Sequence, residues 1–293
     1  MKLSTSTAIL HPSTLKENSI DIRTIPFLLK EAGFESVDWS VWNFCLQGGK
    51  VFDGLLNEDN WQDQIKELAE ADEKAGIPCD QTHCVSVNSA GYQRLDKAHL
   101  RTLEERCLIS SAMLGAKWMV IHPFENAEIE NRDFETNCAF FYEYLKPLIE
   151  LAHRFQVGIA VENMIQRPDL TPRRFCADAS QLHDFVAYVN DPLVGCCWDT
   201  GHGHLSGQNQ RDSLLLLAPY LHATHIDDNF GNDYDAHLLP LEGKIDWCGV
   251  LETLKELNYQ DAFAFEHALN PMPKEIIPLQ LRYMASLGKQ LLA

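Results

Sequence analysis

The sequence predicts a single (β/α)8 TIM barrel, one domain that spans residues 1–293. Short apolar runs alternate with longer stretches of helical spacing roughly every 30 residues, the pattern of repeated strand and helix units. No low-complexity linker or change of composition divides the chain. An open doubly wound sheet is the alternative, and it is disfavoured because no Gly-rich phosphate loop follows an early apolar run.

Eight strands are expected at the short apolar runs, which suit a parallel sheet covered on both faces. The runs occupy residues 5–10, 36–39, 79–85, 118–122, 158–162, 194–199, 222–226 and 262–266. Apolar residues at helical spacing predict helices at residues 25–32, 61–75, 100–114, 135–156, 178–189, 214–220, 246–257 and 277–291.

The ends of these helices carry the residues that usually end them. Gly33 and Gly76 are expected to end the first two helices, and Asp178 and Asp246 to cap two later ones. Pro147 lies inside the stretch 135–156, where it is expected to kink or split the helix.

The chain carries 24 Lys and Arg residues against 42 Asp and Glu residues, a net charge of −18. A surface this acidic disfavours nucleic-acid partners, whose phosphates need a basic footprint. No apolar run approaches the ~20 residues of a membrane span, and the first residues lack the apolar core of a signal peptide. The nine cysteines include no CxxC pair, which favours reduced thiols. We therefore expect a cytoplasmic protein with no membrane partner.

Polar residues follow the carboxyl ends of six successive expected strands, where barrel enzymes place their chemistry. They are His83, His122, Glu162, Asp199 with His202, His225 with Asp227, and Glu266. Any one of them alone would usually be a structural residue, but together on one face they indicate a site. Carboxylates with imidazoles suit a divalent ion such as Mn, Mg, Co or Zn. The cysteines lie within the strands and are excluded as ligands.

The loop after the seventh strand, residues 227–246, adds a second group. Asp235 and His237 alternate, so an extended segment would point both to one side, and we expect them to be functional. For Asp228, Asp233 and Asp246 a solvated acidic turn and a helix cap are the preferred interpretation.

Five motifs carry a family resemblance: VEN at residues 161–163, WDTGHGHLSG at 198–207, HIDDN at 225–229, DAHLLPLEGKIDW at 235–247 and FEH at 265–267. With them the chain resembles the xylose-isomerase-like TIM barrel superfamily. That superfamily includes sugar and sugar-phosphate isomerases and epimerases, and also the zinc-dependent abasic-site endonucleases of AP endonuclease family 2. The likeness spans nearly the whole chain and is densest in its second half.

The resemblance implies roles for these residues. Glu162, Asp199, His225 and Glu266 would hold the catalytic divalent ion, and His202 would contact a substrate oxygen. We also expect His83 and His122 at the substrate. In the nuclease branch the positions of His83 and His122 help to bind a further ion, and those of His202, Asp235 and His237 bind another. The ligand set alone does not separate the two branches.

The charge, and a loop after Glu162 that is not Gly-rich, favour the sugar branch. We expect a metal-dependent isomerase or epimerase of a sugar, sugar phosphate or polyol, in which Glu162 and Glu266 carry protons and the ion stabilises an enediolate. A related dehydratase or lyase of a polyol acid is the nearest alternative. Two less favoured alternatives are a phosphodiesterase that resembles the abasic-site endonucleases and a sugar-binding barrel without catalytic activity. The sugar, its phosphorylation, the metal and a homo-oligomeric state stay open.

Three other features border the expected site. Four aromatic residues are candidates for the pocket wall, although about half of them could serve core packing instead: Trp39, Trp42, Phe44 and Phe124. Residues 48–54 form a loop that is long enough to act as a lid. Arg167, Arg173 and Arg174 are placed to receive a phosphate, although surface charge near a helix start is the preferred interpretation.

Overall fold

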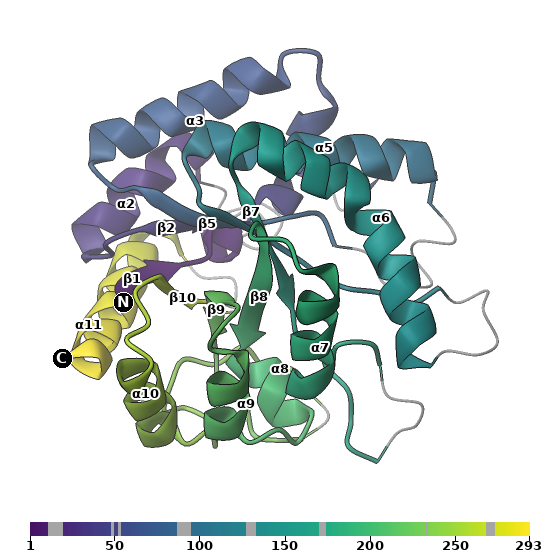
Figure 1. The fold of residues 1–293 in the computed structure, drawn as a ribbon. Coiled ribbons are helices and arrows are strands. Elements are labelled where there is room, and N and C mark those ends of the chain that lie inside the picture. The colour runs from purple at the N-terminus through teal and green to yellow at the C-terminus, as the bar shows by residue number, and fades with distance from the viewer. Residues whose placement is uncertain are drawn as a thin grey trace.

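The structure is a computed structural model of the 293-residue chain. It describes residues 1–10, 20–47, 50–51, 54–86, 95–126, 133–169, 174–232, 234–267 and 273–293. Figure 1 shows a central sheet of parallel strands with the main helices around its outside.

Eight parallel strands make up this sheet, in the order β1-β10-β9-β8-β7-β6-β5-β2. They are β1 Lys2–Thr5, β2 Val37–Trp39, β5 Cys79–His83, β6 Trp118–Ile121, β7 Gly158–Glu162, β8 Val194–Asp199, β9 Leu221–Ile226 and β10 Ala262–Phe265. The two ends of the order meet through a parallel bridge between Ser6 and Asp38. The sheet is therefore a nearly closed (β/α)8 barrel, as the sequence predicts.

The helices lie outside the sheet. They are α2 Ile25–Ala32, α3 Trp61–Ala75, α5 Lys97–Leu114, α6 Phe134–Phe155, α7 Ala179–Val189, α8 Thr200–Leu205, α9 Gln210–Leu217, α10 Trp247–Glu256 and α11 Ile277–Leu292. Short 3-10 turns occupy η1 Thr7–Leu10, η3 Ile22–Thr24, η4 Val41–Cys45, η5 Leu55–Asn57 and η6 Lys274–Ile276. A hairpin joins β3 Leu46–Gln47 to β4 Lys50–Val51.

The first predicted strand, at residues 5–10, is wrong in its position. The strand is Lys2–Thr5, and the apolar run after it forms η1. At the start of this turn, Ser6 Oγ accepts a hydrogen bond from the Ala8 N–H at 3.3 Å. Ile9 and Leu10 are buried in this turn. A short buried apolar run does not by itself distinguish a strand from a helical turn.

Two predictions about helices are decided by the structure. Of the two outcomes expected at Pro147, the split does not occur, because α6 continues through this exposed residue. Asp178 occupies the N-cap position of α7, but its side chain accepts Gln208 Nε2 at 3.0 Å and no α7 N–H. Asp246 does cap α10, through the Gly249 N–H at 3.2 Å.

The barrel separates an inner and an outer core, because successive strand residues point to opposite faces. Val120, Ala160, Cys197 and Ala223 form a small cluster of their own, and their strand neighbours pack with the helices in the main core. The inner residues are small, and Trp118 packs against them. They lie below the strand ends, so the barrel interior is filled beneath the candidate site.

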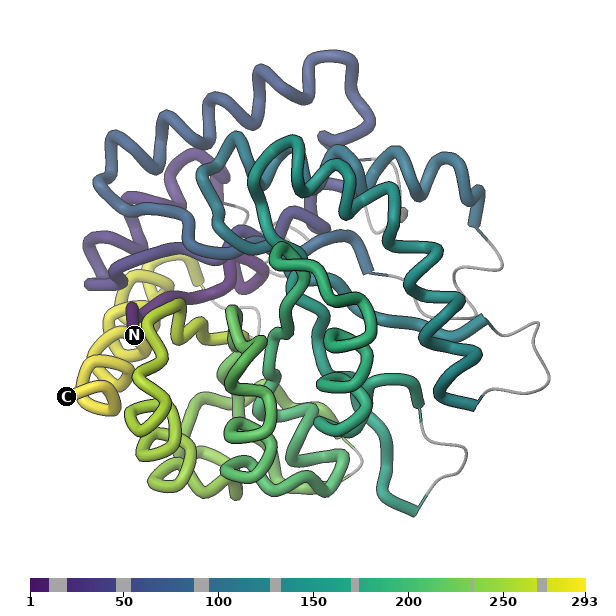
Figure 2. The backbone as a smooth tube through the Cα atoms, in the orientation of Figure 1, coloured from purple at the N-terminus to yellow at the C-terminus, as the bar shows by residue number. Residues whose placement is uncertain are grey.

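The first and last elements of the chain are neighbours. Figure 2 shows the two termini on the same side of the molecule, where α11 packs against β1. Among the described residues, no helix is both long and apolar enough to cross a membrane. All nine cysteines are free thiols.

Candidate metal centre

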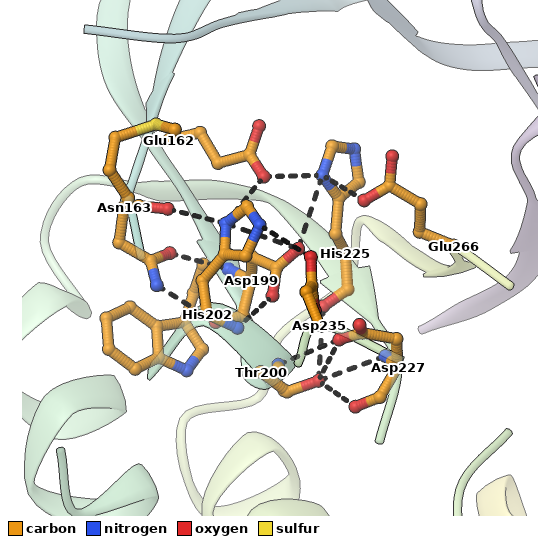
Figure 3. Close-up of polar contacts among 12 residues, drawn as sticks. Glu162, Asn163, Asp199, Thr200, His202, His225, Asp227, Asp235 and Glu266 are labelled. Atoms are coloured by element: carbon orange, nitrogen blue, oxygen red, sulfur yellow. Dashed lines mark hydrogen bonds and ion pairs between the residues drawn. The ribbon is translucent and has the colours of Figure 1, made fainter. Parts of the chain in front are cut away.

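The carboxyl ends of six adjacent strands deliver polar side chains to one end of the barrel. They are His83 in β5, His122 after β6, Glu162 in β7, Asp199 in β8, His225 in β9 and Glu266 after β10. Three more come from the adjoining α8 and from the loop after β9: His202, Asp235 and His237. The structure thus brings every predicted site residue to one region, and Figure 3 shows most of them converging.

Glu162, Asp199, His225 and Glu266 form a central cluster, whose ligand atoms all lie within 4.8 Å of one another. His225 Nδ1 lies 3.0 Å from Glu162 Oε1 and 3.3 Å from Glu266 Oε2. Asp199 Oδ2 lies 4.0 Å from the same nitrogen. Three carboxylates and one imidazole nitrogen therefore surround one point, a donor set that suits a divalent ion.

The burial of the central cluster provides a test of this fit. Glu162, Asp199 and His225 are completely buried. Asp199 Oδ2 has no hydrogen-bond partner among the described residues, whereas Glu162 Oε2 faces the imidazole nitrogens of His122 and His83. A buried carboxylate oxygen without a hydrogen bond is costly, and a cation beside it would remove that cost. The residues present therefore fit a bound divalent ion.

His83 and His122 form a histidine cluster with the second oxygen of Glu162. The two Nε2 atoms lie 3.2 Å apart. Glu162 Oε2 lies 3.0 Å from His122 Nε2 and 3.3 Å from His83 Nε2. Since Glu162 belongs to both clusters, its two oxygens face two adjacent candidate cation positions.

A loop cluster lies on the other side of the central cluster. His237 Nε2 lies 2.8 Å from Asp235 Oδ2, and His202 Nε2 lies 3.5 Å from the same oxygen. Asp227 joins them, because its ligand atom lies within 4.8 Å of those of Asp235 and His237. The sequence predicts His202, Asp235 and His237 for this second position, and Asp227 is an addition from the structure.

Backbone carbonyls orient three of these imidazoles. The Nδ1 atoms of His83, His202 and His237 lie 2.8, 2.9 and 2.9 Å from the carbonyl oxygens of Cys84, Asn163 and Glu266. A carbonyl only accepts, so each Nδ1 carries the proton and donates it. When a ring is neutral, its Nε2 then has the lone pair toward the cavity, the arrangement that metal-binding histidines require.

The electrostatics of the site reflect an excess of buried carboxylates. Burial and the neighbouring Asp227 raise the pKa of Asp199 well above its usual value. Burial opposes ionisation of Glu162, but the charges of His225 and His122 outweigh it and hold its pKa well below normal. Burial lowers the pKa of His202, and Asp199 and Asp235 more than compensate, to about 10. Protons on the imidazoles thus balance part of the negative charge of the buried carboxylates. A bound divalent cation would balance the same charge.

Asp228 shapes the loop that carries the loop cluster. It is buried rather than solvated, so the predicted acidic turn is wrong for this residue. Its carboxylate accepts the N–H groups of Asn229, Gly243, Lys244 and Ile245 at 2.8, 2.9, 3.0 and 3.1 Å, and the Trp247 Nε1–H at 2.8 Å. A Cβ on Gly243 would lie 2.3 Å from Asp228 Oδ1, which explains the glycine there. Asp233 lies outside the described residues.

A cavity of about 390 Å³ opens over the clusters, a size that suits a small molecule. Its lining includes His83, His122, Glu162, His202, Asp235, His237 and Glu266, together with Trp42, Ser86, Met164, Ile165 and Arg174. Of the aromatics considered for the wall, only Trp42 lines it. Trp39, Phe44 and Phe124 are buried in the core instead. Most of the loop considered as a lid, 48–54, lies outside the described residues.

The three arginines considered for phosphate binding have different environments. Arg174 lines the cavity. Arg167 is exposed and pairs with Asp169 through two contacts, of 3.0 and 2.8 Å. Arg173 lies outside the described residues.

The sequence did not single out Asp38, which contacts the central cluster from below. Its Oδ2 atom lies 3.5 Å from His225 Nε2 and accepts Gln81 Nε2 at 3.0 Å. An acidic residue inside the short apolar run 36–39 was the available signal, because a charge in a buried strand needs a partner.

Comparisons with known proteins agree with this fold. The family described as Xylose isomerase-like TIM barrel matches residues 27–287. The uncharacterised protein y4fM of Sinorhizobium fredii is 28% identical over 272 residues, which cover 85% of this chain and 81% of the relative. The uncharacterised protein MJ1311 of Methanocaldococcus jannaschii is 26% identical over 156 residues, covering 53% of this chain and 52% of the relative.

Solved structures with the same fold match nearly the whole chain. The 3-keto-D-glucoside 4-epimerase YcjR of E. coli aligns with a TM-score of 0.71 at 18% identity, covering 99% of both chains. D-psicose 3-epimerase, solved in the presence of D-fructose, has a TM-score of 0.72 at 14% identity, covering 100% of this chain and 99% of that one. The IOLI protein, solved with a bound zinc atom, has a TM-score of 0.74 at 21% identity, covering 100% and 98%.

Proposed function

The chain belongs to the xylose isomerase-like TIM barrel family, and from that premise we propose that it is a divalent-metal-dependent isomerase or epimerase of a small sugar, sugar phosphate or polyol. One observation carries the proposal: the buried central cluster of Glu162, Asp199, His225 and Glu266, in which Asp199 Oδ2 lacks a hydrogen bond. The epimerases among the structural neighbours, and the zinc in the IOLI protein, support it.

In this proposal Glu162, Asp199, His225 and Glu266 hold the ion. When bound, the divalent ion supplies positive charge that stabilises the negative charge developing on substrate oxygens as a neighbouring C–H loses its proton. Asp199 fixes the start of α8, because its Oδ1 accepts the His202 N–H at 2.6 Å. His202 is thereby held with its Nε2 toward the cavity, where it contacts a substrate oxygen.

Glu162 and Glu266 are the proposed proton carriers. Both lie beside His225 Nδ1, at 3.0 and 3.3 Å, and both line the cavity. The charges of His225 and its neighbours outweigh burial and lower the pKa of both carboxyls, so both are ionised and able to accept a proton. If one removes the proton and the other returns one from the opposite face, the carbon is inverted. If one does both, the product is an isomer.

Solvent deuterium incorporation tests the proposal. The metal-loaded chain is incubated in deuterated water with a panel of ketoses, aldoses and their phosphates, and the products are followed by NMR. We expect turnover of at least one sugar that depends on the divalent ion and labels the reacting carbon. Absence of turnover across the panel contradicts the proposed function. Turnover without label contradicts the proton carriers and indicates a hydride shift.

Hydrolysis of a phosphodiester is a second candidate. The observation that favours it is that the histidine cluster and the loop cluster flank the central cluster, so the chain offers adjacent positions for more than one ion. Adjacent divalent ions can stabilise the attacking and leaving oxygens of a phosphoryl displacement. The net charge of −18 argues against a nucleic-acid substrate.

A further inference from the structure

Arg174 is the one Arg or Lys among the described residues that line the cavity over the clusters. The other charged or ionisable lining residues are imidazoles and carboxylates, which face the candidate cation positions. Arg174 therefore places a permanent positive charge in a cavity that is otherwise suited to hold cations.

This guanidinium has no partner in the described part of the chain, where it makes neither a hydrogen bond nor an ion pair. Its side chain is half-buried, and burial lowers the pKa of the group while Glu125 and Glu162 oppose that shift. Arg167, by contrast, is exposed and already paired with Asp169. A guanidinium at the cavity without a protein partner is available to bind an anionic ligand.

The backbone that follows Arg174 is anchored, which fixes the point from which its side chain extends. The Phe175 N–H donates to Glu125 Oε1 at 2.6 Å, and the Met164 N–H donates to the Cys176 carbonyl at 3.1 Å. The Phe175 side chain is buried and packs against Phe141. The ordered backbone keeps the side chain of Arg174 at the cavity, so that only side-chain freedom is lost when a ligand binds.

We propose that Arg174 binds an anionic group of the substrate, a phosphate ester or a carboxylate, so that the substrate is an acidic sugar rather than a neutral one. The inference rests on the proposed function, because it places the reacting carbons at the central cluster and the anionic end at Arg174. Both anions offer the paired oxygens that a guanidinium binds bidentately. A bound divalent ion would offset the charge of the cavity carboxylates of Glu162 and Glu266, and Asp235 is paired with His202 and His237.

Binding of unreactive analogues tests the inference separately from catalysis. Calorimetry on the metal-loaded chain compares D-glucitol, D-glucitol 6-phosphate and D-gluconate, none of which has a carbonyl group to react. We expect the phosphate or the carboxylate to bind about 10- to 100-fold more tightly than the neutral polyol, as for hydrogen bonds to charged groups. Arg174→Met should remove this preference, and the preferred anion identifies the substrate class.

Two further variants act as controls. Arg167→Met removes the neighbouring exposed arginine and should leave the preference unchanged. Arg174→Gln removes the charge but keeps a polar side chain, and it should lose the preference as Arg174→Met does. Unfolding temperature and metal content are measured for every variant, and a variant that does not fold is replaced by the other.

The outcomes of the binding and labelling experiments are distinct. An absent preference, or one that survives both Arg174 variants, overturns the role of Arg174 even when a sugar is turned over with solvent label. Failure to turn over any sugar overturns the proposed function, whereas an Arg174-dependent preference in the same protein still supports an anion site.

Discussion

Asp38 lies behind His225, with 3.5 Å between its Oδ2 atom and Nε2 of the imidazole, while the three carboxylates of the central cluster face Nδ1 of the same ring. Both residues are completely buried. The Gln81 Nε2 group donates to Asp38 Oδ2 at 3.0 Å and to the Thr224 carbonyl at 3.2 Å, which fixes the carboxylate. A carboxylate at Nε2 favours the tautomer whose Nδ1 lone pair is free for a cation.

Asp38→Asn should therefore weaken metal binding about 10- to 100-fold, the usual effect of removing the partner of a metal-binding histidine. Calorimetric titration of the metal-free chain with Mn²⁺ or Zn²⁺ measures this effect. Asp72→Asn is the matched control, because Asp72 is also a buried aspartate but contacts Trp39, at 2.8 Å. Equal affinities for the two variants would contradict the role given to Asp38.

Asp199→Ala should remove the ion from the central cluster. Its Oδ2 atom is buried without a hydrogen bond, and its Oδ1 atom holds the His202 N–H. Loss of a direct ligand should exceed the effect at Asp38, with affinity falling by more than about 100-fold. Elemental analysis after gel filtration gives the occupancy. Asp178→Ala is the control, because it changes the N-cap position of α7, and this variant should keep full metal occupancy. Metal retained by Asp199→Ala would refute the assignment of Asp199 as a ligand.

The strands of the site were predictable from local sequence. The runs at 158–162 and 194–199 match β7 and β8 residue for residue, because buried strands of a parallel sheet are apolar throughout and end where polar residues begin. Since the carboxyl ends of all eight strands meet at one end of a barrel, Glu162 and Asp199 could be placed together without knowledge of their contacts.

Other features depend on contacts between distant segments. The partner of Asp38 is His225, and no local pattern joins these two positions. Arg167 and Arg174 are the same residue type, yet of the two only Arg174 lines the cavity, next to the Phe175 N–H that donates to Glu125. The burial of Asp228 is not predictable from the local pattern, because three of its donors are the N–H groups of Gly243, Lys244 and Ile245, in a turn about 15 residues further along the chain.

Asp72 should make stability depend on pH. Burial raises the pKa of this carboxyl to about 7, against the hydrogen bond from Trp39 that lowers it. In the unfolded chain the group ionises near 4, so between about pH 4 and 7 the folded state binds the extra proton. The contribution of Asp72 to the free energy of unfolding therefore falls as the pH rises from about 4 to 7, and it is constant above pH 7.

Asp72→Asn removes this titration and keeps an oxygen for the Trp39 N–H. Relative to the unmutated chain, the free energy of unfolding of the variant should rise by about 3 kcal/mol between pH 4.5 and 7.5, at 1.36 kcal/mol for each pH unit. Urea unfolding at fixed metal concentration measures the difference. Stability curves that stay parallel over this range would show that Asp72 is ionised in the folded chain.

Abasic-site DNA should not be a substrate. Eighteen excess negative charges repel the duplex, whose binding needs Lys and Arg to displace counterions. We expect no incision of an abasic duplex by the metal-loaded chain at about 0.1 M salt, where screening still leaves charges within ~10 Å interacting. Incision by the pure protein that Glu266→Gln abolishes would instead favour the phosphodiesterase.

Glu162→Gln and Glu266→Gln should separate proton transfer from metal binding. Each substitution keeps the shape of the side chain and removes the base, so kcat should fall about 10²- to 10⁴-fold, the usual contribution of general acid–base catalysis. The Glu162 side chain is buried, with 1% exposed, whereas 20% of the Glu266 side chain is exposed. Glu162→Gln should therefore lose more metal than Glu266→Gln.

The decisive comparison is made at saturating metal, where both variants carry the ion. Solvent deuterium exchange into the substrate should then fall together with turnover in each variant. In an epimerase, one variant should lose exchange in the forward reaction and the other in the reverse reaction, because each glutamate acts on one face of the carbon. Glu256→Gln changes an exposed glutamate paired with Arg211 and serves as the control with normal exchange. If both cavity variants keep normal exchange once the metal is restored, the two glutamates are ligands only, and the proton carrier must be sought among the remaining lining residues, beginning with His202, which faces the same cavity.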